Sequence, residues 1–393
     1  MLSLVVPPTM THAAARPGIE ESFAGFLRRI ESVSREEEKD RMIAGYIAWL
    51  KSHGTPIFED SAAYIIYYGE AGVVTIPSDR NGWNPHADTM TRVGQTKLFY
   101  RRETADPASR WEYKLCVDSL WILDPFNGLQ SQGGFGANSE IRMPQYSPPA
   151  EIEYRHDIHH GILDTLRVAS EVLGRRYTVF VYLPSAFGSP HTRFPSVYVM
   201  DGGDYIGFGR MLNVLDNLIA EKRIVPVVGV FVNSYAANDD TTMDMRMTDY
   251  AMNDSFITFL TSELRPHLLR RYHLKEQPEE TAIMGVSLGG LVATYATLLR
   301  PGTFGLCAAQ SPSYHWNDGA IIDLVAQTPR KPVKIYIDTG TMHDAAENTR
   351  KMRDILRAKG YLYRYMEYPE GHNWYSWRSR IDDILMYFWG TGE

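Results

Sequence analysis

Cysteine and long apolar runs are scarce in this chain, which has two cysteines in 393 residues. Cys116 and Cys307 fall in different predicted domains, so a disulfide framework is excluded. No apolar stretch approaches the ~20 residues that span a bilayer, so no membrane partner is expected. The start of the chain lacks the basic segment of a secretory signal, and the possibility that such a signal has been removed stays open. We expect a soluble protein, with its compartment, cytoplasmic or periplasmic or secreted, undetermined.

An excess of positive charge is also missing. Lys and Arg number 40 against 47 Asp and Glu, giving a net charge of −7 without any Lys/Arg-rich run. A nucleic-acid partner is therefore not expected. Apolar residues make up 44% and aromatic residues 12% of the chain, which excludes a disordered protein and indicates folded cores.

The pattern of the chain predicts four segments. Residues 1–54 form a helical arm, with apolar residues at i, i+3 and i+4 in two pieces that break near Ser34. Residues 55–127 contain short β-rich runs between turn residues and predict a small β-sandwich. Residues 128–150 are rich in Gly, Ser, Gln and Pro and predict a linker. Residues 151–393 form the catalytic domain described next.

Strands and helices alternate in residues 151–393, which predicts an α/β fold with a mainly parallel central sheet covered on both faces. The first strands could pair antiparallel. The expected strands are Thr165 to Ala169, Tyr177 to Tyr182, Ser196 to Met200, Val225 to Val232, Thr281 to Met284, Leu306 to Gln310, Val333 to Ile337 and Tyr363 to Tyr368.

The chemistry centres on the segment TAIMGVSLGG, in which a predicted strand runs into Gly-Val-Ser-Leu-Gly and then into a helix. This is the G-x-S-x-G nucleophile elbow in the strand, turn and helix context that it requires. The glycines at 285 and 289 allow strand and helix to pass closely while Ser287 occupies a strained turn. We predict that Ser287 is a nucleophile; the alternative is that these glycines only tighten a turn.

A serine nucleophile needs a base, which in this chain order is a histidine after the last strand. His372 follows the predicted strand and a Pro-Glu-Gly turn, and fits this role. The segment PVKIYIDTGTMHDAAEN offers three carboxylates to orient it. Asp344 is favoured, because Asp338 belongs to the strand and Glu347 falls in the first turn of a helix; Glu347 stays the alternative.

Two N–H groups should stabilise the developing oxyanion. Leu288 supplies one by its position after the nucleophile. The second is expected from the MDGGDY segment after the Ser196 to Met200 strand, from Gly202 or Gly203, between which the sequence does not decide.

These motifs give residues 151–393 a resemblance to a known family. The stretches RRYTVFVYLP, GVSLGGLVATYATLLRPGTFG, AAQSPSYHW and EGHNWYSWR resemble the esterase family that includes enterochelin-type esterases, feruloyl and acetyl-xylan esterases of carbohydrate esterase family 1, and mycolyltransferases. Residues 55–127 resemble the early-set immunoglobulin-like domains found beside such enzymes. The resemblance implies an α/β-hydrolase fold and a serine esterase that needs no cofactor. Feruloyl-type relatives commonly carry Gly-His-Asp at the terminal histidine, whereas Asn373 follows His372 here.

Aromatic residues near the catalytic edge are candidates for a substrate pocket, with packing around the triad as the equal alternative. They are Tyr314, His315, Trp316, Trp374 and Trp377; Ser311 and Ser313, which directly follow the Leu306 to Gln310 strand, are candidates with them. In the sandwich, Trp83, Trp111 and Trp121 are assigned to the core in preference to a sugar platform. The histidines of the H-x-x-H-H stretch at 156–160 lack further ligands, so no metal is expected.

The sequence thus predicts a serine carboxylesterase acting through an acyl-enzyme on hydroxycinnamoyl or acetyl esters, small or carbohydrate-linked. A second hypothesis keeps the triad but makes the substrate a siderophore trilactone or a peptide. A third is a glycan-binding protein with an inactive hydrolase domain. A homo-oligomer stays open.

Overall fold

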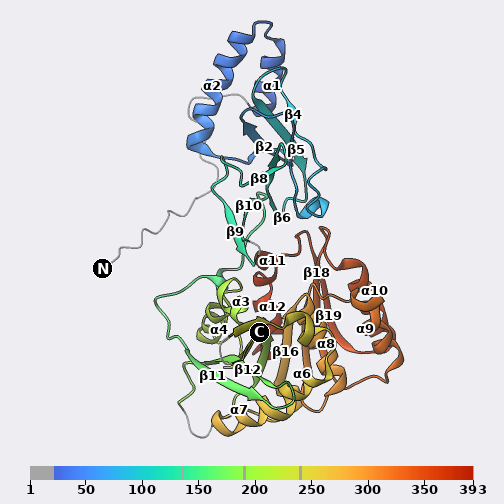
Figure 1. Ribbon diagram of the computed structural model, residues 1–393. Helices are drawn as coiled ribbons and strands as arrows, with labels where there is room; N and C mark the ends of the chain where they lie inside the picture. The colour runs from blue at the N-terminus through green and yellow to red at the C-terminus, as the bar shows by residue number, and fades with distance from the viewer. Residues whose placement is uncertain (1–21, 135, 189–191, 239–240, 393) are drawn as a thin grey trace.

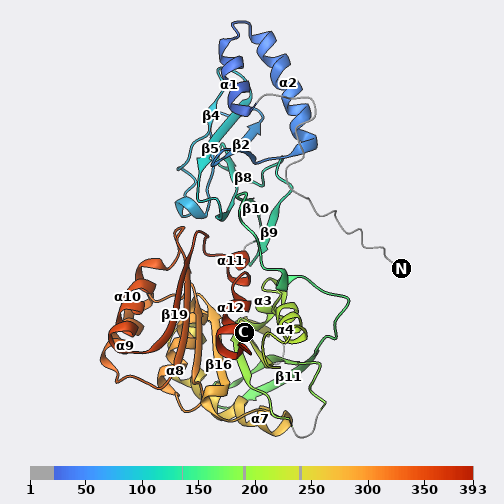
Figure 2. The same cartoon turned by 180° about the vertical axis from the view of Figure 1, so that it is seen from behind.

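The computed structural model describes residues 22–134, 136–188, 192–238 and 241–392. They form an N-terminal region, residues 22–142, and a hydrolase domain, residues 150–392 (Figure 1). The view from behind shows the same division, with the N-terminal region over one end of the large sheet (Figure 2). The first 21 residues of the predicted arm lie outside the described residues.

The helical arm consists of α1 (Phe23–Ser32) and α2 (Glu36–His53), with the break where the sequence predicts it. The Ser22 hydroxyl accepts the Gly25 N–H at 3.0 Å and caps α1. The apolar faces of both helices share one core with a four-stranded antiparallel sheet, so the arm packs onto this sheet.

Three small antiparallel sheets make up the rest of the N-terminal region, in the orders β1-β2-β5-β4, β3-β7-β8 and β6-β10-β9. Their strands are β1 (Ile57–Glu59), β2 (Ala62–Tyr68), β3 (Val74–Thr75), β4 (Thr91–Arg92), β5 (Leu98–Thr104), β6 (Arg110–Tyr113), β7 (Leu115–Val117), β8 (Leu120–Ile122), β9 (Gln130–Gly133) and β10 (Gly136–Arg142). Trp111 is buried in this core, whereas Trp121 is 41% exposed and stacks on Trp83 with ring centroids 6.5 Å apart.

The segment expected as a linker, residues 128–150, differs from the prediction. Strand β10 lies within it and pairs antiparallel with β6, from Ser139 opposite Tyr113 to Arg142 opposite Arg110. The polar composition hides this strand, because two of its three buried side chains, Ser139 and Glu140, are polar and hydrogen-bonded, while Ile141 packs into the apolar core. The connection between the two parts is therefore shorter than expected and begins after Arg142.

The hydrolase domain is built on one large sheet of order β11-β12-β14-β13-β16-β17-β18-β19. Its strands are β11 (Ile162–Ser170), β12 (Arg175–Leu183), β13 (Ser196–Met200), β14 (Val228–Asn238), β16 (Thr281–Val286), β17 (Leu306–Gln310), β18 (Lys334–Gly340) and β19 (Leu362–Tyr368), with β15 (Thr241–Asp244) paired to β14. β11, β12 and β14 pair antiparallel, and the strands from β14 through β13 to β19 run parallel. The predicted α/β fold with a mainly parallel sheet is confirmed.

Helices cover both faces of this sheet and give it two cores. Tyr198 and Met200 point into one core, and their strand neighbours Val197 and Val199 point into the other. The first core is closed by α6 (Asp254–Thr258), α7 (Arg265–Arg271), α8 (Leu288–Leu299), α9 (Trp316–Gln327) and α10 (Ala346–Ala358). The second is closed by α3 (Gly202–Gly207), α4 (Met211–Ala220), α11 (Trp374–Arg378) and α12 (Ile381–Trp389). The short helix α5 (Arg246–Tyr250) packs beside α8.

Among the described residues, no helix has the length and hydropathy needed to cross a bilayer.

Candidate active site

The nucleophile elbow forms where β16 ends and α8 begins. Ser287 lies between them with φ 57° and ψ −119°, a conformation that L-residues rarely adopt. A Cβ on Gly285 would lie 2.5 Å from the carbonyl carbon of Gly289, so the crossing of strand and helix requires glycine there. The Ser287 N–H donates to the carbonyl of Gln310 at 2.9 Å, which ties the elbow to β17. The motif therefore holds a half-buried serine at the carboxyl edge of the sheet.

His372 and Asp344 meet at the same edge of the sheet. Nδ1 of His372 lies 2.6 Å from Oδ1 of Asp344, which follows β18, while His372 follows β19. The Asp344 side chain is fully buried and the His372 side chain is 39% exposed. This places the carboxylate behind the imidazole and leaves the imidazole open on its other side.

Asp344 is held by several donors besides the histidine. Its Oδ2 accepts hydrogen bonds from the Ser311 hydroxyl and from the Gly340 N–H, the latter at 2.6 Å. Burial raises the pKa of Asp344, but the hydrogen bonds from His372 and these donors outweigh burial, and the pKa lies below its ordinary value of 3.8. An ionised Asp344 can accept a hydrogen bond from an N–H at Nδ1 of His372.

The hydroxyl of Ser287 faces a second serine in this structure. Ser287 Oγ lies 3.1 Å from Ser313 Oγ, and no hydrogen bond between described residues joins Ser287 to His372. Catalytic hydrogen bonds are often long or misaligned before substrate binds, so this geometry is typical of a resting site.

The two other carboxylates of the predicted segment lie apart from His372. Glu347 is exposed in α10 and pairs with Lys351 at 2.8 Å. Asp338 is buried at the end of β18, where Oδ2 accepts from Gln310 Nε2 at 3.3 Å. Asp344 is thus the carboxylate of the three that contacts the imidazole.

Buried Asp338 makes stability depend on pH. Burial raises its pKa from 3.8 to about 7. The folded state then holds this proton more tightly than the unfolded chain, and that stabilisation is lost as pH rises from about 4 to about 7. Asparagine does not titrate, so the Asp338→Asn variant should not lose this stabilisation as pH rises. We expect the free energy of unfolding of the variant minus that of the parent to be about 2 to 3 kcal/mol larger at pH 8 than at pH 5.

Denaturant unfolding at both pH values measures this difference. Exposed Asp318 offers the matched control, because its replacement by Asn should leave the pH dependence unchanged. Equal pH dependence in Asp338→Asn and the parent would contradict the prediction.

The candidate oxyanion donors lie on both sides of the elbow. Leu288 follows Ser287 at the start of α8, and Gly202 begins α3 after β13. The Gly203 N–H already donates to Oδ1 of Asn233 at 2.7 Å. Gly203 could therefore serve an oxyanion only by releasing Asn233, a constraint that the sequence did not reveal.

The aromatic residues predicted for the pocket have different surroundings. The Trp377 ring is perpendicular to the His372 ring with 4.8 Å between centroids, and Trp377 Nε1 donates to Ser311 Oγ at 3.0 Å. Trp374 packs against Trp377 and Tyr205 in the core. Through these contacts, Trp377 packs against His372 and Trp374 packs against Trp377.

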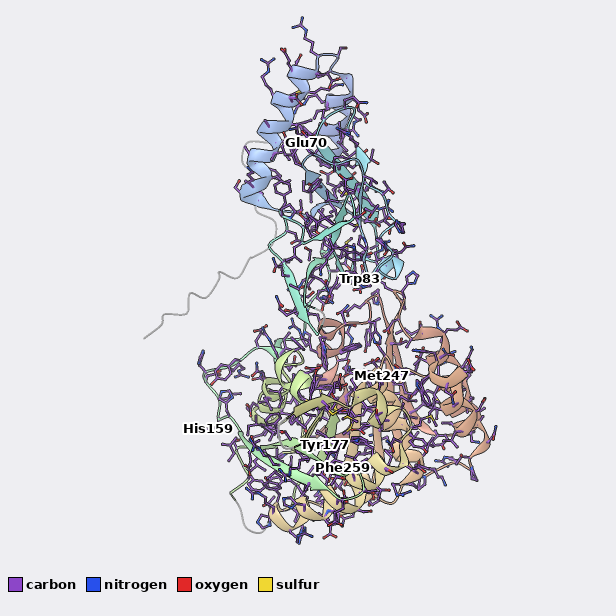
Figure 3. The ribbon with its side chains drawn as sticks, viewed as in Figure 1. Glu70, Trp83, His159, Tyr177, Met247 and Phe259 are labelled. Carbon is purple, nitrogen blue, oxygen red and sulfur yellow. The ribbon has the colours of Figure 1, made fainter. Side chains whose placement is uncertain are left out.

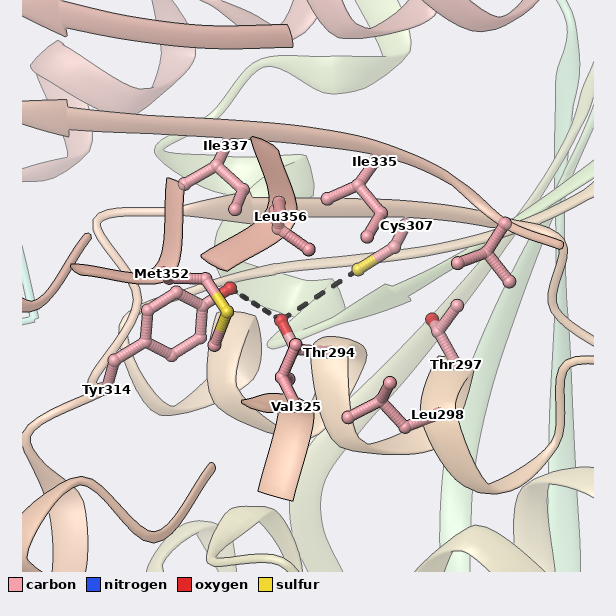
Figure 4. A pocket seen from close by; sticks show the side chains of 11 residues that line it. Thr294, Thr297, Leu298, Cys307, Tyr314, Val325, Ile335, Ile337, Met352 and Leu356 are labelled. Atoms are coloured by element: carbon pink, nitrogen blue, oxygen red, sulfur yellow. Dashed lines mark hydrogen bonds between the residues drawn. The ribbon is translucent and has the colours of Figure 1, made fainter. Parts of the chain in front are cut away.

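The Tyr314 segment lies below α8. The Tyr314 side chain is buried, hydrogen-bonds Thr294 Oγ1 at 2.7 Å and borders a small apolar cavity (Figure 4). His315 is exposed, and Trp316 is half-buried against the core. Tyr314 therefore supports the fold beneath the nucleophile.

Three contributors to the site have no sequence motif of their own. Ser311 hydrogen-bonds Asp344, Ser313 hydrogen-bonds Ser287, and Asn373 joins the histidine loop to the N-terminal region. The signals available were the position of both serines directly after β17 and the departure of Asn373 from the Gly-His-Asp pattern.

Comparison with known proteins adds relatives of stated activity. The chain is 26% identical over 288 residues to the iron(III) enterobactin esterase of Dickeya dadantii, a match that covers 67% of this chain and 63% of that protein. It is 27% identical over 242 residues to the endo-1,4-beta-xylanase/feruloyl esterase of Xylanibacter ruminicola, covering 59% of this chain and 32% of that protein. The chain thus spans less than two thirds of either relative.

The fold is shared with a solved structure over most of the chain. The enterobactin esterase of Shigella flexneri, solved in the presence of enterobactin, superimposes with a TM-score of 0.70 at 20% identity, covering 87% of this chain and 97% of that one. The family model described as "Putative esterase" matches residues 170–388, more than half of the chain. On this match, the chain belongs to that esterase family.

Proposed function

We propose that this member of the esterase family hydrolyses carboxylic esters with Ser287 as nucleophile, His372 as general base and Asp344 as the group that orients His372. The observation that carries the proposal is the 2.6 Å hydrogen bond between Asp344 and His372 at the sheet edge where Ser287 occupies the strained elbow. Ser287, Asp344 and His372 follow three separate strands, β16, β18 and β19, in the chain order Ser, Asp, His that the fold uses.

In the proposed reaction, Ser287 Oγ leaves its partner Ser313 and transfers its proton to Nε2 of His372 while Oγ bonds to the ester carbon. The N–H groups of Leu288 and of Gly202 or Gly203 stabilise the oxyanion. Collapse of the tetrahedral intermediate expels the alcohol, which takes the proton from His372. Water then attacks the acyl-enzyme with His372 again as base, releasing the acid and regenerating Ser287.

For the substrate, the first candidate is an ester of the enterobactin type, a trilactone with aromatic acyl groups. Its support is that the likeness to the enterobactin esterase fold extends over 87% of this chain and so includes much of the N-terminal region. The second candidate is a hydroxycinnamoyl or acetyl ester, supported by the relative with feruloyl esterase activity in its name, which matches 59% of this chain.

A panel of esters tests the proposal and ranks the substrates. We expect hydrolysis of p-nitrophenyl acetate, inhibited by a fluorophosphonate, and a kcat/KM for enterobactin at least tenfold above that for methyl ferulate. The reverse order would favour the hydroxycinnamoyl candidate. No ester hydrolysis by folded protein, together with oligosaccharide binding, would support the glycan-binding alternative.

A further inference from the structure

The loop that carries His372 is in contact with the N-terminal region as well as with its own domain. Figure 3 shows Trp83 at the end of the N-terminal region that faces the hydrolase domain. Trp83 Nε1 donates to Oδ1 of Asp79 at 3.0 Å, in the short helix η1 (Asp79–Asn81). Asp79 in turn contacts the histidine loop, so this turn lies over the carboxyl edge of the sheet.

Asn373, the residue after His372, is bound by two side chains of the N-terminal region. Its Oδ1 accepts from Arg110 Nη1 at 2.6 Å, and its Nδ2 donates to Oδ2 of Asp79 at 2.9 Å. The same Oδ1 accepts the Ser376 N–H at 3.0 Å and caps α11. One amide therefore joins the start of α11 to the N-terminal region.

Gly371, the residue before His372, also touches the N-terminal region. A Cβ on Gly371 would lie 2.2 Å from Cγ of Asp79, so the loop backbone lies too close to this carboxylate for any residue other than glycine. The Arg110 N–H donates to the carbonyl of Pro369 at 3.3 Å. His372 is thus flanked in the chain by two residues that both contact Asp79.

The partners on the N-terminal side are themselves firmly held. The Arg110 side chain is fully buried and pairs with Glu112 and Glu140 at 2.7 Å each. Asp79 is buried, and its Oδ2 also accepts the Glu112 N–H at 2.8 Å. A buried, hydrogen-bonded ionic cluster moves little, so it offers a fixed anchor to a loop at a surface.

The loop that carries Asp344 also lies close to the N-terminal region. A Cβ on Gly82, the residue after η1, would lie 3.3 Å from Nδ1 of His343, the neighbour of Asp344. One turn of the N-terminal region therefore touches both loops that present the Asp344 and His372 pair.

We propose that Asn373, Asp79 and Arg110 are positioning residues, through which the N-terminal region holds the His372 loop in its catalytic geometry. The inference rests on the proposed function, because it requires His372 to be the base. It assigns the N-terminal region a part in turnover besides any part in binding substrate, and it explains the asparagine that replaces the aspartate of the Gly-His-Asp pattern. With aspartate at position 373, a carboxylate oxygen would stand in place of the amide Nδ2 that now donates to Asp79, and two carboxylates would face each other.

Asn373→Asp is the test variant, because it keeps the acceptor for Arg110 and the cap of α11 and changes only the atom that faces Asp79. We expect kcat for p-nitrophenyl acetate to fall about 10- to 100-fold, since displacements of about 1 Å cost that much, with KM changed less than about threefold.

Tyr146→Phe is the matched control at the other end of α11. It removes the 3.3 Å contact between Tyr146, in the connection between the two parts, and Ser379, which follows α11, and should leave kcat within about twofold. Ser287→Ala in the same assay decides the proposed function separately. When activity depends on Ser287, either of two results would overturn the inference: a kcat of Asn373→Asp within twofold of the parent, or an equal loss of kcat in Tyr146→Phe.

Discussion

Ser287→Ala is expected to reduce kcat for p-nitrophenyl acetate by about 10³-fold or more, with little change in KM. The substitution removes the oxygen that forms the acyl-enzyme, and water then has to attack the ester with only the oxyanion donors to help. The variant should fold as the parent does, because the serine is half-buried and the hydrogen bond of the Ser287 N–H to Gln310 is a backbone contact that alanine keeps.

Ser313→Ala is the matched control for this substitution. Its hydroxyl lies 3.1 Å from Ser287 Oγ, so it samples the same site while the proposal gives it no covalent role. We expect it to retain kcat within about tenfold of the parent. Substantial turnover by Ser287→Ala, or a loss in Ser313→Ala as large as in Ser287→Ala, would place the nucleophile elsewhere.

Asp344→Asn is expected to lower kcat by about 10²- to 10⁴-fold while leaving the site assembled. An asparagine can still hydrogen-bond Nδ1 of His372, but it stabilises the imidazolium less and permits the tautomer whose Nε2 carries the proton and cannot act as base. The two hydrogen bonds that Ser311 and Gly340 donate to Oδ2 should be kept, because the amide oxygen of asparagine can accept both.

Glu347→Gln separates the two carboxylates that the sequence left open. Glu347 is exposed and paired only with helix neighbours among the hydrogen bonds described, so we expect its kcat to match the parent within about twofold. Steady-state kinetics on p-nitrophenyl acetate measures both variants. A large loss in Glu347→Gln with none in Asp344→Asn would reverse the assignment of the acid.

The sequence predicted those features whose signals are local. The G-x-S-x-G motif between an apolar strand and helix predicts the elbow, and the buried β16 and the strained φ of Ser287 agree with it. The parallel strands also have a local signal. Strands that are buried on both faces consist of nearly continuous apolar residues, so apolar runs of four to six residues predicted them.

Features that depend on distant pairs were not predictable. Strand β10 was taken for a linker because two of its buried residues, Ser139 and Glu140, are polar and form hydrogen bonds with Asp124 and Arg110 from elsewhere in the chain. The contact of Asn373 with Arg110 and Asp79 spans 263 and 294 residues, and nothing in the local pattern of any of the three indicates it. The early-set immunoglobulin-like identity of residues 55–127 stays a prediction.

Covalent labelling of the protein by a fluorophosphonate, followed by peptide mass mapping, tests the central claim most directly. The account predicts one adduct per chain, on the peptide that contains Ser287, absent in Ser287→Ala and formed at least tenfold more slowly in Asp344→Asn. An adduct on another residue, or none on folded parent protein, would contradict the assignment of Ser287 as the nucleophile.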